Sequence, residues 1–452
     1  MNKDKFKEEC GIFGVFSKKK YFKVSYLTYY GLYALQHRGQ ESSGITVARD
    51  NKLFTYKDMG LVREIYTKDT LNNLIGSSSI GHVRYSTTGD SNVINAQPLL
   101  GNFKSQEIAI AHNGNLINSE ILRKELIDKG VTFNTTTDSE VILKLIETSG
   151  KENIEESIIY SVKKIKGSFS VVVLTPDKLL CIRDPKGIRP LCLGKIENSY
   201  IIASESCALD TINATFSRNV MPGEIVVIDK NGLKSINYSS DSNSATCVFE
   251  YIYFSREDST IDNVNVYHSR YLCGKQLYKE CPADGDVVIG VPNSGIPAAM
   301  GYAKASGIPY VSGFTKNNYI DRSFIQPSQN LREECISIKL NPIKSNINGK
   351  RVIVIDDSLV RGNTSKKIVA MLKNCGAKEV HFRVASPIVK HCCHFGIDTF
   401  NKNDLLGSYM SLDDIKKNLQ ADSIGYLSIK GLIKSIGRSN LCLGCFNGMY
   451  PI

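Results

Sequence analysis

The stretch Val352-Ile-Val-Ile-Asp-Asp-Ser-Leu-Val-Arg-Gly-Asn-Thr-Ser365 joins a short apolar run, two carboxylates, a glycine turn and hydroxyl side chains. The apolar run predicts a strand buried on both faces, and residues Asn363 to Cys375 predict a helix that Gly376 ends. A glycine turn at a helix start aims backbone N–H groups and the positive helix end at an anion. We therefore expect a phosphate to bind around Arg361 to Ser365.

Asp356 and Asp357 follow the apolar run directly. Carboxylates in this place can accept hydrogen bonds from ribose hydroxyls or bind Mg²⁺, which prefers oxygen ligands. A phosphate site beside a ribose site describes a phosphorylated sugar. A bare Asp-Asp pair is usually a solvated pair in a plain connection, but the whole segment is far more specific.

The same order of strand, tight turn and helix occurs upstream of this stretch. Asp286 to Val291 predicts a strand, Pro292 to Gly295 a turn, and Ile296 to Ser306 a helix. Val380 to Ala385 predicts a further strand downstream. Parallel strands joined by helices predict an open α/β sheet, whose ligands bind at the carboxyl ends of the strands.

The first half of the chain has a different pattern, rich in Gly, Asn, Ser and Thr with short β-branched runs. This pattern predicts a strand-dense, mainly antiparallel domain with a few helices, one of which Thr137 or Asp138 could cap. The polar, aperiodic segment Ser239 to Ala245 marks the boundary between the halves. The elements expected before it are strands at Val171–Leu174 and Ile201–Ala203 and helices at Leu27–Leu35 and Ser139–Thr148.

The composition indicates a folded protein of two or three domains, with 452 residues of which 42% are hydrophobic and 22% charged. No apolar run could span a bilayer, and Met1 to Glu9 carries charges of both signs where a signal peptide is apolar. We therefore expect a cytoplasmic protein that contacts no membrane and keeps its 13 cysteines in a reducing compartment. The net charge of +11 includes no block dense in Lys and Arg, so it favours small phosphorylated ligands over nucleic acid.

Cys10 precedes Gly11 to Phe16, whose alternation predicts a first strand. Taken alone, it is most simply a buried or incidental cysteine. If Met1 to Glu9 were removed, the thiol would lie beside its own α-amino group, whose pKa of roughly 8 suits a general base. Cys10 would then be an N-terminal nucleophile.

Three further motifs decide between these interpretations of Cys10. Arg84 can hold a carboxylate through a two-pronged contact, and Asp138 can pair with an ammonium group. The side-chain amide of Asn113 and the N–H of Gly114 can stabilise an oxyanion. Each residue alone has an ordinary structural explanation, as a surface cation, a helix cap or a hairpin turn. Together they describe a thiol that attacks an amide while the site grasps a carboxylate and an ammonium, which is a glutaminase.

With Leu35-Gln-His-Arg-Gly-Gln-Glu-Ser-Ser-Gly44, these motifs closely resemble the class II glutamine amidotransferase domain. The resemblance implies an α+β N-terminal nucleophile sandwich over residues 10–238, preceded by a propeptide of residues 1–9. The roles that it implies are Cys10 as nucleophile, Asn113 and Gly114 as oxyanion hole, Arg84 and Asp138 as glutamine clamps, and Arg38 as an organiser behind them.

The stretch from Val352 to Ser365 closely resembles the phosphoribosyl pyrophosphate (PRPP) motif of type I phosphoribosyltransferases. This resemblance implies an α/β phosphoribosyltransferase domain over residues 246–452, in which Ser294 contacts the metal and Asn293 stands where an acidic residue is more usual. The polar segment Lys316 to Arg332 suits a lid over a polyanion. The residues implied to bind substrate or Mg²⁺ are Asp356 and Asp357 for the ribose hydroxyls and the metal, Arg361, Gly362, Thr364 and Ser365 for the 5-phosphate, and Lys316 and Arg322 of the lid.

The two domains in this order resemble the glutamine PRPP amidotransferase family over essentially the whole chain. The resemblance implies that glutamine, PRPP and water give 5-phospho-β-ribosylamine, glutamate and pyrophosphate, the first committed step of purine synthesis, with ammonia channelled from Cys10 to the PRPP site. It further implies purine nucleotides as feedback inhibitors and a homotetramer. Two alternatives are a class II amidotransferase with a different acceptor, against which the Asp356–Asp357 pair argues, and a non-catalytic PRPP-binding regulator that binds nucleic acid.

Cys442 and Cys445 have the two-residue spacing of a metal site, an iron–sulfur ligand pair or a redox pair. Resemblance to the cluster-bearing branch of the family implies a [4Fe-4S] cluster that Cys247 and one of Cys392 or Cys393 complete, with Cys393 at the family's ligand position. Four thiolates would also satisfy zinc. The remaining thiols, expected to be buried without a chemical role, are Cys181, Cys192, Cys207, Cys273, Cys281, Cys335 and Cys375.

Overall fold

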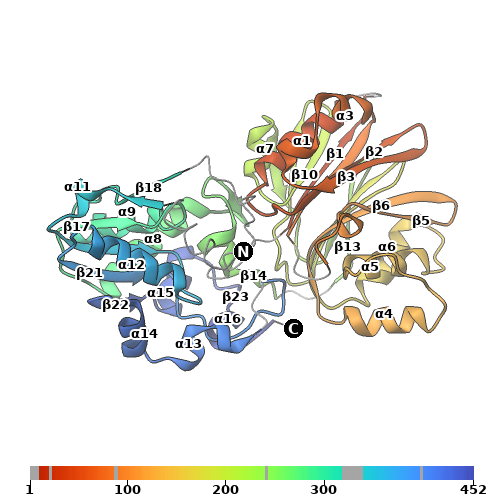
Figure 1. Cartoon of the computed structure of the whole chain (residues 1–452). Helices are drawn as coiled ribbons and strands as arrows, with labels where there is room; N and C mark the ends of the chain where they lie inside the picture. Colours follow the sequence, from red (N-terminus) through yellow and green to blue (C-terminus); the bar gives the residue numbers. More distant parts are fainter. Residues whose placement is uncertain are drawn as a thin grey trace.

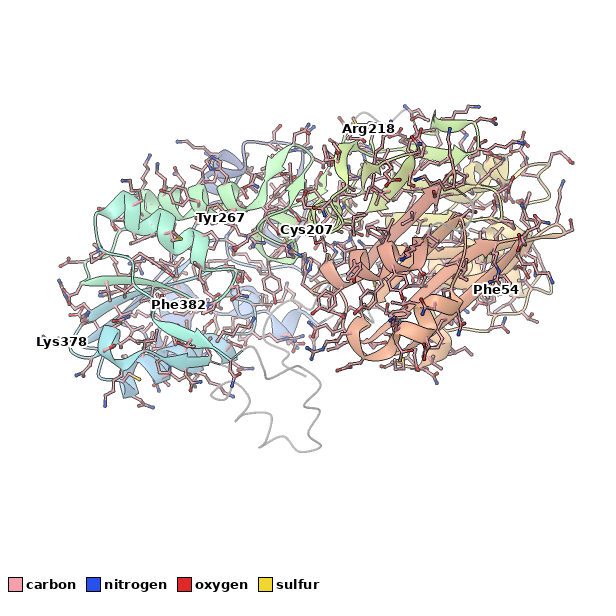
Figure 2. The ribbon with its side chains drawn as sticks, turned by 90° about the horizontal axis from the view of Figure 1, so that it is seen from above. Phe54, Cys207, Arg218, Tyr267, Lys378 and Phe382 are labelled. Carbon is pink, nitrogen blue, oxygen red and sulfur yellow. The ribbon has the colours of Figure 1, made fainter. Side chains whose placement is uncertain are left out.

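The computed structural model of the chain describes residues 10–19, 23–85, 90–239, 243–317, 340–397 and 401–451. The ribbon forms two lobes, with the first half of the sequence in one and the second half in the other (Figure 1). Seen from above, Phe54 and Lys378 lie toward opposite ends of the molecule, and Cys207 lies near the junction of the lobes (Figure 2). No helix in these ranges is long and apolar enough to cross a membrane.

The N-terminal lobe is built on two antiparallel sheets. The first has the order β11-β9-β10-β1-β4-β2-β3, which places β1 at its centre between β10 and β4. Its strands are β1 (Gly11–Ser17), β2 (Ser42–Arg49), β3 (Lys52–Met59), β4 (Ser78–Arg84), β9 (Cys192–Ile196), β10 (Ser199–Ala203) and β11 (Thr215–Asn219). The second sheet has the order β13-β12-β8-β7-β6-β5. Its strands are β5 (Leu99–Phe103), β6 (Gln106–Leu116), β7 (Gly167–Leu174), β8 (Leu179–Arg183), β12 (Glu224–Asp229) and β13 (Gly232–Asn237).

Alternate side chains of β1 point to opposite faces of the first sheet, as the pleat of a strand requires. Phe13 packs with Leu32 under a layer of helices, whereas Ile12 packs with Ala111 of β6 between the two sheets. Helices also cover the outer face of the second sheet, so the lobe has four layers and the predicted α+β sandwich is confirmed. The helices are α1 (Val24–Ala34), α2 (Val62–Ile65), α3 (Lys68–Asn73) and α7 (Cys207–Thr211) on the first sheet and α4 (Ser119–Ile127), α5 (Ser139–Glu147) and α6 (Ile154–Val162) on the second.

The C-terminal lobe contains a sheet of order β17-β20-β21-β22, in which every neighbouring pair is parallel. β20 is buried on both faces, because Val352 packs with Ile368 on one side while Ile353 packs with Ala298 on the other. This confirms the predicted open α/β sheet. The strands are β17 (Val287–Gly290), β20 (Arg351–Asp356), β21 (Glu379–Val384) and β22 (Ser423–Tyr426), and the helices packed around them are α8 (Val266–Glu280), α9 (Ile296–Ser306), α12 (Asn363–Asn374), α14 (Leu412–Leu419) and α15 (Ile429–Ile436).

Short elements complete the C-terminal lobe and its junction with the first. β14 (Thr246–Cys247) pairs in parallel with β23 (Leu441–Cys442), which brings segments far apart in the sequence side by side. A short π-helix, η2 (Glu250–Phe254), follows β14. The remaining short elements are η1 (Val93–Asn95), β15 (Thr260–Ile261), β16 (Val264–Asn265), β18 (Phe314–Lys316), β19 (Leu340–Pro342), α11 (Lys344–Ile347), η3 (Lys402–Asp404), α13 (Leu406–Tyr409) and α16 (Gly444–Asn447).

Most of the expected elements are present, with shifts of a few residues. The helix expected from Leu27 begins earlier, at Val24, and β22 is a strand that was not predicted. Two of the thiols expected to be buried, Cys281 and Cys375, are only half-buried, so that prediction is wrong for them. Each lies just past the end of a helix, where part of the side chain faces solvent. Cys335 lies outside the described residues.

Candidate functional site

Cys10 lies immediately before β1, with its thiol in a cavity of the N-terminal lobe. The backbone of Tyr85 holds the sulfur, because its N–H donates to Sγ and its carbonyl accepts from the thiol, both at 3.4 Å. Burial raises the pKa of the Cys10 thiol to about 11, so the thiol is protonated near neutral pH. The residues that line the cavity are Cys10, Arg84, Tyr85, Gln97, His112, Gly114, Thr137, Asp138 and Ser139.

Asn113 and Gly114 lie next to each other on β6, and Gly114 lines the cavity. The Asn113 side chain is 1% exposed, and its Nδ2 has no hydrogen-bond partner among the described residues. A buried donor without a partner lowers the stability of the fold, and a ligand that accepts its hydrogen bond would remove this cost. Gly114 has a φ of 148°, and a Cβ there would clash with the carbonyl oxygen of Ser168. Only glycine fits that position.

Arg84 and Asp138 reach the cavity from different elements. Arg84 ends β4, where its guanidinium donates hydrogen bonds to the Glu41 carboxylate and the Asp90 carbonyl. Asp138 precedes α5 but forms no side-chain cap, so the expected capping role is wrong. Its Oδ2 instead accepts from the N–H of Leu116 at 2.9 Å. A cation and an anion are thus fixed on the wall of one cavity.

Arg38 lies behind the thiol. Its Nε donates to the Cys10 carbonyl at 3.1 Å, and its other nitrogens bind the carboxylates of Glu205 and Glu250. All three charged side chains are fully buried. Glu250 belongs to η2 of the C-terminal lobe, so this ion pair crosses the junction between the lobes.

Several residues of the cavity wall are not predicted from the sequence, among them Gln97, His112 and Ser139. Gln97 accepts from the N–H of His112 at 2.7 Å and donates to the Ser139 hydroxyl at 3.0 Å. Burial lowers the pKa of His112, whose Nδ1 lies 3.0 Å from the Ser139 hydroxyl. His112 directly precedes Asn113, which is a signal that sequence reasoning could have used. Gln97 and Ser139 offer no such signal, because only the tertiary structure brings them to this wall.

In the C-terminal lobe, Asp356 and Asp357 are buried at the carboxyl end of β20. The Asp357 carboxylate accepts hydrogen bonds from the hydroxyl of Ser294, in the loop after β17, and from that of Ser358 at 2.6 Å. The two loops that the sequence singles out therefore meet at the carboxyl edge of the sheet. Carboxylate and hydroxyl oxygens gathered in this way fit the ligand preference of Mg²⁺.

The glycine turn after β20 has the geometry of a helix start. Gly362 adopts a φ of 84° at the N-cap of α12, and Thr364 and Ser365 occupy the first turn of that 12-residue helix. Arg361 pairs with Asp404 at 2.9 Å, which holds its guanidinium beside the turn. Backbone N–H groups of a first helical turn have no partners within the helix, so this turn can bind an anion.

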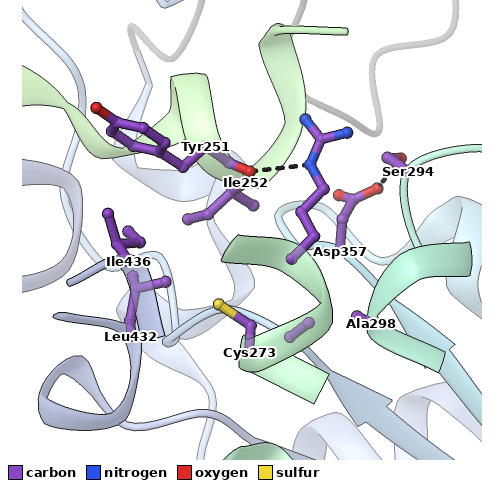
Figure 3. A pocket seen from close by; sticks show the side chains of 10 residues that line it. Tyr251, Ile252, Cys273, Ser294, Ala298, Asp357, Leu432 and Ile436 are labelled. Atoms are coloured by element: carbon purple, nitrogen blue, oxygen red, sulfur yellow. Dashed lines mark hydrogen bonds between the residues drawn. The ribbon is translucent and has the colours of Figure 1, made fainter. Parts of the chain in front are cut away.

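A cavity lies between Asp357 and Ser294 on one side and residues of η2 and α15 on the other. Figure 3 shows these two side chains on one side of the cavity and Tyr251, Leu432 and Ile436 on the other. The cavity is thus polar where the carboxylate lies and apolar opposite it. The other lining residues are Ile252, Arg270, Cys273, Ala298 and Ala385.

The predicted lid is described only at its beginning. Lys316 is exposed at the end of β18. Arg322 lies outside the described residues, so its role and that of the lid stay predictions.

Of the thiols expected to bind a cluster, Cys247, Cys442 and Cys445 belong to one buried cluster of side chains, and Cys393 packs against it. Cys247 lies opposite Cys442 in the register of the parallel strands β14 and β23, and Cys445 follows in α16. Burial and the nearby thiols of Cys393 and Cys442 raise the pKa of Cys445, whereas the charges that influence Cys392 are Lys402 and Asp404. Within the described ranges, no three His, Cys, Asp or Glu side chains are placed to hold a single metal ion as they stand.

Two family models match the chain, one in each lobe. A glutamine amidotransferase domain matches residues 82–211, and a phosphoribosyl transferase domain matches residues 274–392. The chain is also 46% identical to the amidophosphoribosyltransferase of Synechocystis, over 99% of its own length and 92% of that protein. It is 44% identical to the amidophosphoribosyltransferase of Bacillus subtilis, over 98% of its own length and 94% of that protein.

Two solved structures have the same fold from end to end. The glutamine PRPP amidotransferase of B. subtilis, complexed with ADP and GMP, superposes with a TM-score of 0.92 at 43% identity and covers 98% of this chain and 97% of that one. A structure described as the allosteric regulatory enzyme of purine biosynthesis gives a TM-score of 0.93 at 43% identity, with 98% and 96% covered. Both lobes are therefore shared with these proteins.

Proposed function

Because the chain belongs to the amidophosphoribosyltransferase family, we propose that its N-terminal lobe releases ammonia from glutamine at Cys10 and its C-terminal lobe transfers that ammonia to PRPP. The reaction that it catalyses is the first step of purine biosynthesis. The observation that carries this assignment is the placement of two sites in different lobes. A cavity of the N-terminal lobe is lined by a thiol, a cation and an anion, and the paired carboxylates lie in the C-terminal lobe. The similarity over both lobes overturns the two alternatives, another acceptor and a non-catalytic regulator.

The proposed chemistry at Cys10 is an acyl transfer. The sulfur attacks the side-chain amide carbon of glutamine, the C–N bond breaks, and the thiol proton leaves with the nitrogen as ammonia. Water then displaces the sulfur from the glutamyl thioester, which gives glutamate and restores the thiol. Negative charge develops on the carbonyl oxygen of the amide in the first step and of the thioester in the second. Asn113 Nδ2 and the Gly114 N–H are the proposed donors to it.

The thiol of Cys10 needs a base, because burial raises its pKa to about 11. Removal of residues 1–9 would place the α-amino group of Cys10 on the same residue as the sulfur. An ordinary α-amino pKa of roughly 8 suits a base that takes the thiol proton and passes it to the departing nitrogen.

Arg84 is proposed to bind the α-carboxylate of glutamine and Asp138 its α-ammonium. Each side chain is already held, Arg84 by Glu41 and Asp138 by the N–H of Leu116. Preorganised groups lose little conformational entropy when a ligand binds, so both can contribute to affinity.

Replacing Asn113 with alanine should lower kcat for glutamate release about 10²- to 10³-fold, because one oxyanion donor is lost. The KM for glutamine should change little, since the donor acts mainly on charge that develops in the transition state. The matched control is Asn115→Ala on the same strand, whose amide donates to the His394 carbonyl instead. Steady-state assays of PRPP-dependent glutamate release compare the three proteins. An unchanged kcat in the Asn113 variant would contradict the oxyanion assignment.

In the C-terminal lobe, Asp356 and Asp357 are proposed to accept hydrogen bonds from the ribose hydroxyls, and Arg361 to Ser365 to bind the 5-phosphate. The nitrogen lone pair of ammonia attacks C1 of the ribose from the face opposite the pyrophosphate. The C1–O bond breaks with its electron pair on the departing pyrophosphate, the nitrogen loses one proton to solvent, and the configuration at C1 inverts. The cationic side chains of Lys316 and Arg322, in the predicted lid, are proposed to neutralise negative charge on the pyrophosphate.

Asp356, Asp357 and Ser294 are proposed to hold Mg²⁺, because their oxygens are the ligands that this ion prefers. The hydrogen bond between Ser294 and Asp357 supports this, since it puts oxygens of two loops side by side. When bound, Mg²⁺ would neutralise charge on the departing pyrophosphate.

Cys247, Cys393, Cys442 and Cys445 are proposed to bind a [4Fe-4S] cluster with a structural role. The pairing of β14 with β23 supports this proposal. So does the raised pKa of Cys445, to which the nearby thiols of Cys393 and Cys442 contribute along with burial. Four thiolates are the usual ligands of such a cluster. The cluster would tie the beginning of the C-terminal lobe to its last strand.

Protein purified without oxygen should be brown and contain stoichiometric iron and sulfide. Replacing Cys442 with serine should remove the iron, because the cluster then lacks one thiolate. Cys273→Ser, which alters a buried thiol of α8, should retain the iron and serves as the matched control. Absorption spectra with iron, sulfide and zinc analysis make the measurement. Stoichiometric zinc without iron would contradict the cluster.

Further proposals concern regulation and assembly. Purine nucleotides are proposed as feedback inhibitors, because the similar B. subtilis structure is complexed with ADP and GMP. Ammonia is proposed to pass between the lobes through an internal channel. The family resemblance and the composition support the further proposal of a homotetramer in the cytoplasm, without contact to nucleic acid or membrane.

A further inference from the structure

The ion pair between Arg38 and Glu250 connects the thiol site to the other lobe. Two nitrogens of Arg38 donate to the two oxygens of Glu250 at 3.0 and 2.8 Å, while Nε donates to the Cys10 carbonyl at 3.1 Å. A two-pronged contact of this kind fixes both the plane and the distance of the guanidinium. The location of the Cys10 carbonyl therefore depends on a carboxylate supplied by the C-terminal lobe.

Glu250 is itself held in place on several sides. The Ser255 hydroxyl donates to its carboxylate, and Arg189 lies 3.9 Å away. Burial opposes the charge of Glu250, but the Arg38 guanidinium holds its pKa below the ordinary value. Nη1 of Arg38, which donates to Glu250, also donates to the Glu205 carboxylate at 2.5 Å. Glu250 is thus a charged, fully desolvated anchor for Arg38.

The π-helix that carries Glu250 is braced from the second site. The carbonyls of Tyr251 and Ser255 accept from Arg270 at 2.9 and 2.8 Å. Burial lowers the pKa of Arg270, and the nearby Asp357 carboxylate opposes that effect. Figure 3 shows Tyr251 and Asp357 facing one cavity. Glu250, which binds Arg38, therefore lies on a segment that hydrogen bonds hold to the lobe with the paired carboxylates.

We propose that Glu250 is a positioning residue for Cys10, acting through Arg38 across the junction between the lobes. This inference rests on the proposed role of Cys10 as nucleophile. After removal of residues 1–9, Cys10 would be tethered by the chain on one side only. The hydrogen bond from Arg38 to its carbonyl then limits rotation of the whole residue, and with it the direction of Sγ.

Glu250→Gln keeps the shape of the side chain but replaces one acceptor by a donor and removes the charge. The kcat for glutamate release should fall about 10- to 100-fold, because a nucleophile displaced by about 1 Å loses that much rate. The KM for glutamine should stay close to that of the parent protein, since Arg84 and Asp138 are untouched. Synthesis from added ammonium salt should also be retained, because it does not use the thiol.

Asp262→Asn is the matched control for Glu250→Gln. Asp262 accepts hydrogen bonds from Arg183 at 2.8 and 2.9 Å, so it also forms a largely buried two-pronged ion pair across the junction. In the described part of the chain, neither residue is hydrogen-bonded to Cys10. If loss of docking between the lobes were the cause, Asp262→Asn would reproduce the loss in kcat. Equal losses in both variants overturn the proposal, and a loss confined to Glu250→Gln supports it.

A second variant guards against misfolding. If Glu250→Gln lacks ammonia-dependent synthesis, Glu250→Asp is measured, which keeps the charge but is one methylene shorter. It should show a smaller loss in kcat with the same unchanged KM, and an unchanged kcat overturns the proposal. Glutamine-dependent activity that survives replacement of Cys10 would instead overturn the role of the thiol, so the two failures are distinguishable.

Discussion

Replacing Cys10 with alanine should lower synthesis of phosphoribosylamine from glutamine by on the order of 10³-fold or more, because the thioester cannot form. The described lining of the cavity holds no second thiol that could take over. Synthesis from added ammonium salt should persist, since ammonia then reaches the C-terminal lobe without the thiol. Pyrophosphate release, measured with each nitrogen source in turn, separates the two half-reactions.

Cys181→Ala is the matched control for Cys10→Ala. Cys181 is a buried thiol between the two sheets of the same lobe, so its loss tests the general effect of removing a cysteine. Both activities should remain in this variant. The intact mass of the purified parent protein should correspond to a chain that begins at Cys10. An active enzyme that retains residues 1–9 would contradict the α-amino group as base, and glutamine use by the alanine variant would contradict the nucleophile.

Replacing Asp357 with asparagine should lower kcat/KM for PRPP by about 10²-fold or more. The carboxylate is buried and bound to the Ser294 hydroxyl, so its charge is expected to act directly on the ribose hydroxyls and Mg²⁺. Hydrogen bonds to charged groups contribute about 1.5–3 kcal/mol each, and the metal site would lose a negative ligand as well. Initial rates at varied PRPP and Mg²⁺ concentrations measure the effect.

The matched control for this variant is Asp286→Asn, at the amino ends of the strands of the same sheet. Asp286 precedes β17 and pairs with Arg351 at 2.9 Å on the surface. Solvent and salt screen an exposed pair of this kind, so this change should leave PRPP kinetics unaltered. Similar losses in both variants would show that the effect at Asp357 is one of stability, contrary to its assigned role.

The strand, turn and helix units of the C-terminal lobe were the most predictable part of the fold, because their signals are local. α9 occupies Ile296–Ser306 as predicted, with Pro297 in its first turn and Gly307 left-handed at a φ of 76°. Proline at a helix start and glycine after its end constrain the backbone whatever packs around them. The sequence of β22 has only a weak alternation of apolar and polar residues. Its pairing with β21 is what makes it a strand.

In the thiol site, the sequence predicted only those residues whose motif allows few chemical roles. Cys10 and Asn113 stand in motifs that limit what they could do, and the structure brings Gly114 beside Cys10. Asp138 shows the opposite case, because its carboxylate meets the N–H of Leu116 and leaves the helix start uncapped. Glu250 could not be foreseen, since it follows its partner Arg38 by 212 residues.

The arrangement of the junction bears on how the enzyme is synthesised. The N-terminal lobe completes β13 at Asn237, so a nascent chain can fold that lobe while the ribosome is still translating the rest. β14, however, finds its partner only when Leu441 emerges, and η2 with Glu250 stands directly after β14. In an incomplete chain, Glu250 is therefore not yet held in the place from which it binds Arg38. We expect such a chain to hydrolyse glutamine poorly, which would spare the cell wasteful release of ammonia before an acceptor site exists.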